Sequence, residues 1–262
     1  MTPPNSGDDA VKKGAVLRFH DGEGEHAIPI PAPPTHGTML DLLPAAREIS
    51  GHVTALALER ERAAGRTISC RAGCGACCRQ LVAISVIEAE SLARLVAEMP
   101  EERAAMIRGR FAAAVKRLEG AGLLPAEEPG GNRALVAKDA KNVTDGRREI
   151  SSRYFALGIA CPFLENESCS IHPERPMVCR EYHVTTPASI CADLYKVPVG
   201  RVDSPLRMGE VLARTAAKVA TGETFMIPLV LSLEWSAVHG AEITATHEGR
   251  ALMDAMVGEL GK

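Results

Sequence analysis

Residues 70–78 read CRAGCGACC and place four cysteines within nine positions. A second group follows in residues 161–191, CPFLENESCSIHPERPMVCREYHVTTPASIC. The two groups hold all the cysteines of the chain, which are Cys70, Cys74, Cys77, Cys78, Cys161, Cys169, Cys179 and Cys191. A tetrahedral Zn²⁺ site and an iron–sulfur cluster each take four such ligands. The pattern therefore predicts that the fold brings two distant segments together around metal, with all eight cysteines as candidate ligands.

The spacing inside the first group adds detail. Gly73 and Gly75 flank Cys74 and give the backbone freedom to turn around a metal. Cys77 and Cys78 are neighbours, and neighbouring side chains point in different directions in both strands and helices. Either the pair serves two metals or a polynuclear cluster, or one thiol ligates while the other packs. We favour the first interpretation.

The expected compartment decides how the cysteines are interpreted. The N-terminal stretch MTPPNSGDDAVKKGA lacks the apolar segment of a signal peptide. No stretch approaches the roughly 18 apolar residues that span a bilayer. We therefore expect a cytoplasmic protein with no membrane association. Reducing surroundings and a chain of 262 residues both argue against disulfides, so metal ligation is favoured over disulfides, redox thiols or unrelated buried cysteines.

Composition points to a helical protein without a nucleic-acid partner. Apolar residues make up 46% of the chain and aromatic residues only 3%, so Ala, Leu, Val, Ile and Met must build the core. Ala and Leu favour helices. The 30 basic and 33 acidic side chains give a net charge of −3, which excludes a strongly basic surface for nucleic acid.

The predicted fold class is mainly α with a small N-terminal β-hairpin, and irregular cysteine-rich metal-binding loops lie on the helical scaffold. Residues 1–14 are expected to form a disordered tail. The hairpin is predicted in 15–31 around Asp21 and Gly22. Helices are predicted over 41–64, closed by Gly65, then over 85–98, 100–120, 204–220, 229–239 and 247–260. Ser85 and Glu88 form a capping box at the start of the second helix.

The segments between these helices are expected to be less regular. Residues 80–84 are predicted to be extended, and 121–150 to be a polar region that separates the two cysteine groups. Residues 15–262 are predicted to be a single domain, with a metal-binding cysteine core in 66–195 and C-terminal helices in 204–262.

Charged side chains accompany the cysteines. A thiolate-ligated centre is anionic and is stabilised by nearby cations and N–H donors. The candidates lie in or beside the cysteine runs and are Arg71, Arg79, Arg175 and Arg180. The nearby carboxylates of Glu174 and Glu181 are expected to lie in solvent.

Two histidines could replace a cysteine as ligand, because imidazole binds zinc and some iron–sulfur centres. They are His172 and His183, and we favour a structural, hydrogen-bonded role for both. Phe163 and Tyr182 are expected to pack around the centre rather than to do chemistry.

These motifs carry a resemblance to a known family. CRAGCGACCRQ, then CPFL, then CSIHPERPMVCREY resembles the CxxCxxCC family of YkgJ-type cysteine cluster proteins, described as zinc- or iron-chelating domains. The family's Arg-Pro-x-x-Cys-Arg step falls on 175–180. The first gap is three residues rather than two, and His172 stands where tyrosine is more usual. The resemblance covers about 70–191 and implies metal binding by the eight cysteines. Some relatives are called flagellin lysine methylases, but the chain has no glycine-rich strand-to-helix turn for a nucleotide-like methyl donor.

Three functions follow from this pattern. The first is an iron–sulfur or mixed iron and zinc protein that transfers electrons or supports an oxidoreductase, with a protein redox partner. The second is a structural zinc module that serves protein interaction. The third, ranked last, is a metal-dependent enzyme that modifies a protein. No residue is assigned a catalytic role, because no Ser–His–Asp or paired-carboxylate site is found.

Overall fold

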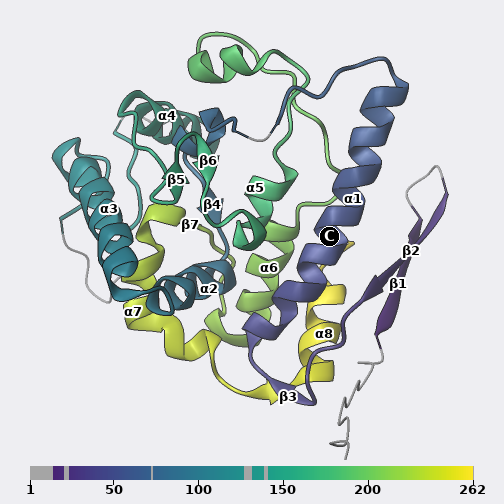
Figure 1. Ribbon diagram of the computed structural model, residues 1–262. Helices are drawn as coiled ribbons and strands as arrows, with labels where there is room; N and C mark the ends of the chain where they lie inside the picture. The colour runs from purple at the N-terminus through teal and green to yellow at the C-terminus, as the bar shows by residue number, and fades with distance from the viewer. Residues whose placement is uncertain (1–13, 21–23, 72, 127–131, 139–140, 262) are drawn as a thin grey trace, which may run out of the picture.

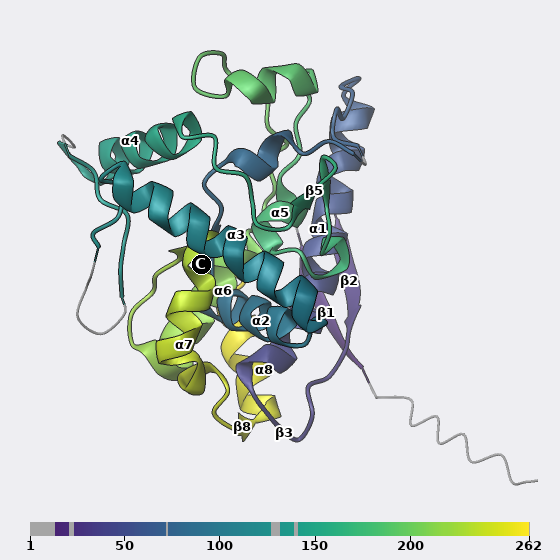
Figure 2. The ribbon, with the colours of Figure 1, turned by 60° about the vertical axis from the view of Figure 1, so that its left-hand side comes forward.

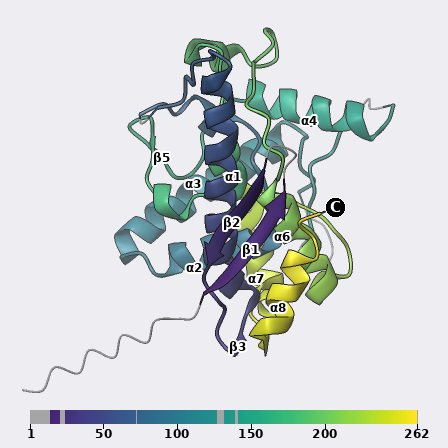
Figure 3. The same ribbon diagram turned by 90° about the vertical axis from the view of Figure 1, so that its right-hand side faces the viewer.

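The N-terminal hairpin forms as predicted. The computed structural model describes residues 14–20, 24–71, 73–126, 132–138 and 141–261 (Figure 1). Strands β1 (Ala15–His20) and β2 (Glu25–Ile30) pair antiparallel. Ile28 and Ile30 alternate with exposed residues and are buried against α1, and Figure 3 shows the hairpin lying across that helix. The predicted turn at Asp21 and Gly22 and nearly all of the predicted tail lie outside the described residues.

The first long helix is α1 (Leu43–Ala63), which follows a 3-10 turn, η1 (Met39–Leu42). Ile49, Val53 and Ala57 recur at helical spacing and are buried. Gly65 has φ of +77°, a left-handed conformation that glycine adopts at low cost, so the predicted end of the helix is confirmed.

The centre of the fold is α2 (Val86–Ala97). The capping box is confirmed, since Ser85 Oγ accepts a hydrogen bond from the Glu88 amide at 3.3 Å and Glu88 Oε2 accepts one from the Ser85 amide at 3.0 Å. Helix α3 (Glu101–Gly120) follows, and α7 (Ser232–Ile243) packs against α2. Helix α2 also packs against η1 and α3, and Figure 2 shows α3 and α7 beside it, so most of its residues are buried.

The C-terminal helices pack back onto this unit. Helix α6 (Met208–Ala216) continues into a π turn, η6 (Ala217–Thr221), and a 3-10 turn, η7 (Leu229–Leu231), leads into α7. Helix α8 is Gly249–Val257. The helices were predicted to begin at 204, 229 and 247, a few residues too early. At the first of these, Ser204 Oγ bonds the Leu206 carbonyl at 2.9 Å and holds a turn ahead of α6.

Two short strand pairs tie the ends of the chain together. Strand β3 (His36–Gly37) pairs with β8 (His247–Glu248), and β4 (Ala83–Ile84) pairs with β7 (Ile227–Pro228). The main hydrophobic core draws on residues from Ile28 to Met256. The single-domain boundaries of 15–262 stay a prediction.

One helix was not anticipated. Helix α4 (Val143–Ala156) begins inside the region 121–150, which was expected to be a polar spacer, and runs past its end. Asn142 caps it by accepting a hydrogen bond from the Asp145 amide at 2.9 Å. The helix buries Tyr154 in a second, smaller core with the end of α3 and η7. Only Gly146 and Tyr154 of α4 are buried, so its sequence lacks the apolar periodicity that predicts a helix.

The fold class is confirmed as mainly α with a small N-terminal hairpin and cysteine-rich loops. Within the described ranges, no helix combines the length and the apolar character that crossing a bilayer requires.

Candidate metal centre

The eight cysteines lie on short, irregular elements. Cys77 and Cys78 are in the 3-10 turn η2 (Ala76–Arg79), which Cys70 and Cys74 precede. In the second group, the elements are the hairpin β5 (Leu164–Glu165) and β6 (Ser168–Cys169), the short helix α5 (Met177–Glu181) and the 3-10 turn η5 (Ala188–Asp193). They carry Cys169, Cys179 and Cys191, and Cys161 lies just before β5. All eight are free thiols, so none forms a disulfide; Cys191 is buried and the others are half-buried.

Backbone contacts join the two groups. The Cys161 amide donates a hydrogen bond of 2.7 Å to the Cys78 carbonyl. On the other side, η2 packs against η5, the turn that carries Cys191. A Cβ added to Gly75 would lie 2.7 Å from Glu167 Oε2 and Leu164 Cδ1 and 3.1 Å from Glu167 Cα, so a larger residue would require these side chains and the β5–β6 turn to shift. The predicted meeting of the two segments is therefore present in the structure.

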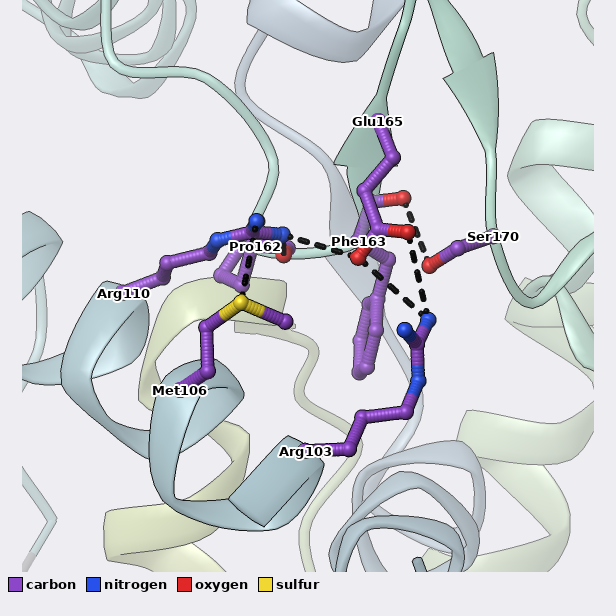
Figure 4. A network of polar contacts seen from close by, with 7 residues as sticks. All are labelled: Arg103, Met106, Arg110, Pro162, Phe163, Glu165 and Ser170. Atoms are coloured by element: carbon purple, nitrogen blue, oxygen red, sulfur yellow. Dashed lines mark hydrogen bonds and ion pairs between the residues drawn. The ribbon is translucent and has the colours of Figure 1, made fainter.

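The β5–β6 hairpin is fixed to α3 by an ionic network (Figure 4). Arg103 and Arg110 both reach the Glu165 carboxylate, at 3.3 and 3.1 Å, and Arg110 also donates to the Pro162 carbonyl at 3.0 Å. Beneath them, the Phe163 ring packs edge-on against Phe111 with centroids 5.6 Å apart. Phe163 thus packs in the hydrophobic core, and its expected place around a metal centre stays a prediction. These contacts hold the loop of Cys161 and the strand of Cys169 on a rigid helix.

The thiols influence one another through charge. Burial raises the pKa of several of them, which are Cys70, Cys161 (to about 12), Cys169, Cys179 and Cys191. A hydrogen bond with Cys78, together with burial, raises the pKa of Cys77. These thiols hold their protons at neutral pH, and a metal would displace them on binding.

Cys77 stands at the centre of this electrostatic network. Its charge raises the pKa of Cys161, Cys169 and Cys179, and it also raises the pKa of Cys70 and Cys191. Within the first set, Cys169 raises the pKa of Cys161, and both of them raise the pKa of Cys179. Cys70 and Cys191 form a different set with Cys74. The network therefore divides into two sets that meet at Cys77.

The donor chemistry suits thiophilic metals, but the ligand geometry is not assembled. Among the described residues, no three Cys, His, Asp or Glu side chains form a group that could hold a metal ion. A bound metal cation attracts thiolates and so holds them close together, whereas neutral thiols have no such attraction for one another. Metal binding would have to draw the two segments closer together, and the eight cysteines remain predicted ligands.

The four arginines differ in their surroundings. Arg79 pairs with Glu167 at 2.5 Å and Arg71 is exposed. Arg180 donates to the carbonyls of Arg175 and Pro173. The positive charge of Arg175 opposes the rise in the pKa of Cys70, Cys77 and Cys169.

The two histidines differ as well. His172 is exposed, and the charge of Arg175 and its desolvation lower its pKa. His183 is half-buried; burial lowers its pKa, and its Nδ1 has no hydrogen-bond partner among the described residues. Tyr182 packs beneath the Arg201 guanidinium, whose carbon lies 5.3 Å from the ring centroid, and its hydroxyl accepts from Gln80 at 3.4 Å.

Two carboxylates were expected in solvent, and both have partners. Glu174 forms an ion pair with Arg47 of α1. Glu181 is half-buried, and its Oε1 accepts from Ser50 Oγ at 2.8 Å and from the Met208 amide at 3.0 Å. Burial raises the pKa of Glu181 to about 7. The expectation was wrong for Glu181 because α5 lies between α1 and α6, which a local sequence pattern does not reveal.

Sequence reasoning missed a second role for Glu88. Its Oε1 accepts a hydrogen bond of 2.7 Å from the Met177 amide at the start of α5, two residues before Cys179. The capping-box signal identified Glu88 as a helix-start residue, but it gave no sign of this tertiary contact. A groove of about 330 Å³ was also not foreseen; it lies between α3 and residues 159–164, and Cys161 is part of its lining.

The comparison with known families agrees with this site. The model of the CxxCxxCC family, described as "Putative zinc- or iron-chelating domain", matches residues 69–193. No curated protein and no solved structure matches the chain. The matched range contains both cysteine groups and the segments that join them. Residues 69–193 are therefore similar to the CxxCxxCC family of zinc- or iron-chelating domains.

Proposed function

We propose that the eight cysteines bind an iron–sulfur centre that transfers electrons. The observation that carries this proposal is the adjacency of Cys77 and Cys78 in η2, a turn that Cys161 joins through a hydrogen bond of 2.7 Å and that packs against η5, which carries Cys191. Two mononuclear zinc sites would divide the ligands cleanly. A ligand that lies between two sets suits a polynuclear centre, or two centres that share a thiolate.

The position of the thiols supports electron transfer. Seven of the eight are half-buried rather than deeply buried, so the centre lies near the surface. Such a centre would exchange electrons with a protein redox partner in the cytoplasm. The net charge of −3 gives no reason to expect nucleic acid as that partner.

The test is metal content and the visible spectrum of protein purified without oxygen. We expect roughly two to four iron per chain and a broad absorbance near 400 nm. Colourless protein without iron would refute the proposal. The variant Cys77→Ala should lose more iron than Cys74→Ala, because Cys74 is coupled to only one set. Arg79→Gln is the control, since Arg79 pairs with Glu167.

A structural zinc module is the second candidate. Sites closed by four cysteine ligands are usually structural, and zinc that joins the two segments would contribute its binding energy to folding. One or two zinc per chain without colour, with a fall in thermal midpoint on chelation, would support this candidate. An unchanged midpoint after zinc removal would exclude it.

A further inference from the structure

The N-terminal hairpin has two edges, and proline protects one of them. Pro29 of β2 lies opposite Val16 of β1. Because proline has no N–H, these two residues form a non-hydrogen-bonded pair of the ladder, and the backbone nitrogen of Pro29 points away from β1. Proline at such an outward position removes a donor from the β2 edge, which discourages another strand from pairing there.

The β1 edge has no comparable protection. Its sequence AVLRFH contains neither proline nor lysine, and its register with β2 runs from Ala15 to His20 without a bulge. Arg18 is two residues from Val16 and shares its phase in the ladder, so the amide and carbonyl groups of both residues point away from β2. In the described part of the chain, no backbone hydrogen bond reaches either residue from outside the strand pair. Strand β1 therefore presents an open edge.

This edge is accessible. Figure 1 shows the hairpin at the right-hand margin of the molecule, outside α1 and α8. Among the described elements, only β2 shares more than marginal backbone contact with β1. Val16 is 55% exposed, and the charge of Arg18 is balanced within the hairpin by Glu25 at 3.1 Å. Leu17 and Phe19 lie on the other face of the strand and pack against the main core.

We propose that β1 pairs antiparallel with β1 of a second copy of this chain, which joins the two hairpins into one sheet across a twofold axis. An antiparallel edge is complementary to a copy of itself, so the same surface serves both partners. The proposal is independent of the metal centre and of the proposed function.

The side chains of β1 favour one register for this pairing. With Leu17 opposite Leu17 of the second copy, Ala15 lies opposite Phe19, so apolar side chains meet on the core-facing side. On the outer side Val16 lies opposite Arg18, and the outward backbone groups of these two residues form hydrogen bonds across the axis. A register centred on Arg18 would place two arginines side by side, which is destabilising.

The test is sedimentation equilibrium of the whole chain, purified with a reductant so that no disulfide links two copies. A single strand pair is a small interface, so we expect a dimer that dissociates on dilution, with Kd on the order of 100 μM. Val16→Pro removes an outward N–H at the position opposite Pro29. It should weaken the dimer by about tenfold or more, since two symmetry-related hydrogen bonds are lost.

The matched control is Ala27→Pro. Ala27 is exposed and lies opposite Arg18, so its N–H also points outward, but from the β2 edge. This variant should dimerise within about twofold of wild type. Wild-type protein that stays monomeric up to about 1 mM would overturn the proposal, because even a small specific interface associates at that concentration. Unchanged dimerisation of Val16→Pro, or equal weakening by both prolines, would also overturn it.

If Val16→Pro loses the circular dichroism spectrum of the wild type, two substitutions that keep the N–H decide the question. Val16→Lys sets a positive charge beside Arg18 of the second copy, and Val16→Glu sets a negative charge there. The glutamate variant should dimerise about fivefold more tightly than the lysine variant, since the pair occurs twice across the axis. Equal dissociation constants for the two variants would overturn the proposal.

Discussion

The replacement Glu88→Ala tests how the cysteine-bearing helix α5 is held in place. Glu88 is 4% exposed. One carboxylate oxygen accepts from the Met177 amide at 2.7 Å, and the other accepts from the Ser85 amide at 3.0 Å and the Ser85 hydroxyl at 2.7 Å. A single side chain thus completes the N-terminus of α2 and fixes the first residue of α5.

The expected loss follows from these contacts. Alanine leaves two backbone N–H groups without their acceptors, and each buried unsatisfied group costs roughly 1–3 kcal/mol. Burial raises the pKa of Glu88, so removing a buried carboxyl recovers part of that cost. We expect the free energy of unfolding to fall by about 3 kcal/mol. Glu88→Gln keeps an acceptor for Met177 but sets an amide N–H₂ against the Ser85 N–H, so a loss of about 1–2 kcal/mol is expected.

Urea unfolding of the metal-free protein at pH 7 measures these differences, and hydrogen exchange reports the Met177 amide directly. The control is Glu48→Ala in α1, where the side chain is exposed and a change within about 0.5 kcal/mol is expected. A loss below about 1 kcal/mol for Glu88→Ala, with the Met177 amide still protected, would show that Glu88 does not hold α5.

The remaining predictions concern pH and two glycines. Glu181→Gln keeps the one oxygen that accepts both hydrogen bonds of Glu181 and removes a carboxyl whose pKa burial raises from 4.5 to about 7. A raised pKa stabilises the folded state below about pH 4.5, and this stabilisation is lost as the pH rises to about 7. The free energy of unfolding of Glu181→Gln, relative to that of the wild type, should therefore increase by about 1–2 kcal/mol from pH 4.5 to pH 8 once solvent screening is allowed for. Urea unfolding at both pH values measures this, and a constant difference would contradict it. Gly249→Ala would bring its Cβ to 1.9 Å from the Pro34 carbonyl oxygen, so a loss of about 2 kcal/mol or more is expected in thermal unfolding. Gly109→Ala in α3 meets no atom within 4 Å and should gain about 0.5–1 kcal/mol; a loss there would refute the steric argument.

The local signals in the sequence predicted the helices well. Apolar residues at helical spacing located α1, and Ser85 with Glu88 located the start of α2, because both signals act within one or two turns. Helix α4 escaped the same reasoning, since it buries little beyond Tyr154 and Gly146. Its cap, Asn142 with Asp145, was present in the sequence and could have indicated it.

The site was only partly predictable for a different reason. The cysteine pattern showed that residues 70–78 and 161–191 would meet, because both carry the same kind of ligand. The pattern could not show that Arg175 and Arg79 differ, since their surroundings depend on tertiary contacts such as the pairing of Arg79 with Glu167. Glu181 was misjudged for the same cause: its partners Ser50 and Met208 come from other helices.

The hydrogen bond from the Cys161 amide to the Cys78 carbonyl has a consequence for biosynthesis. Residue 161 is translated 83 positions after residue 78. At 5–20 residues per second, the first four thiols wait on the order of 4–17 s before their counterparts exist. During that interval they are unpaired on a nascent chain and open to oxidation or to capture of a stray ion. Correct loading of the centre therefore depends on a metal supply that acts after residue 191 has been made, and on reducing conditions that protect the early cysteines until then.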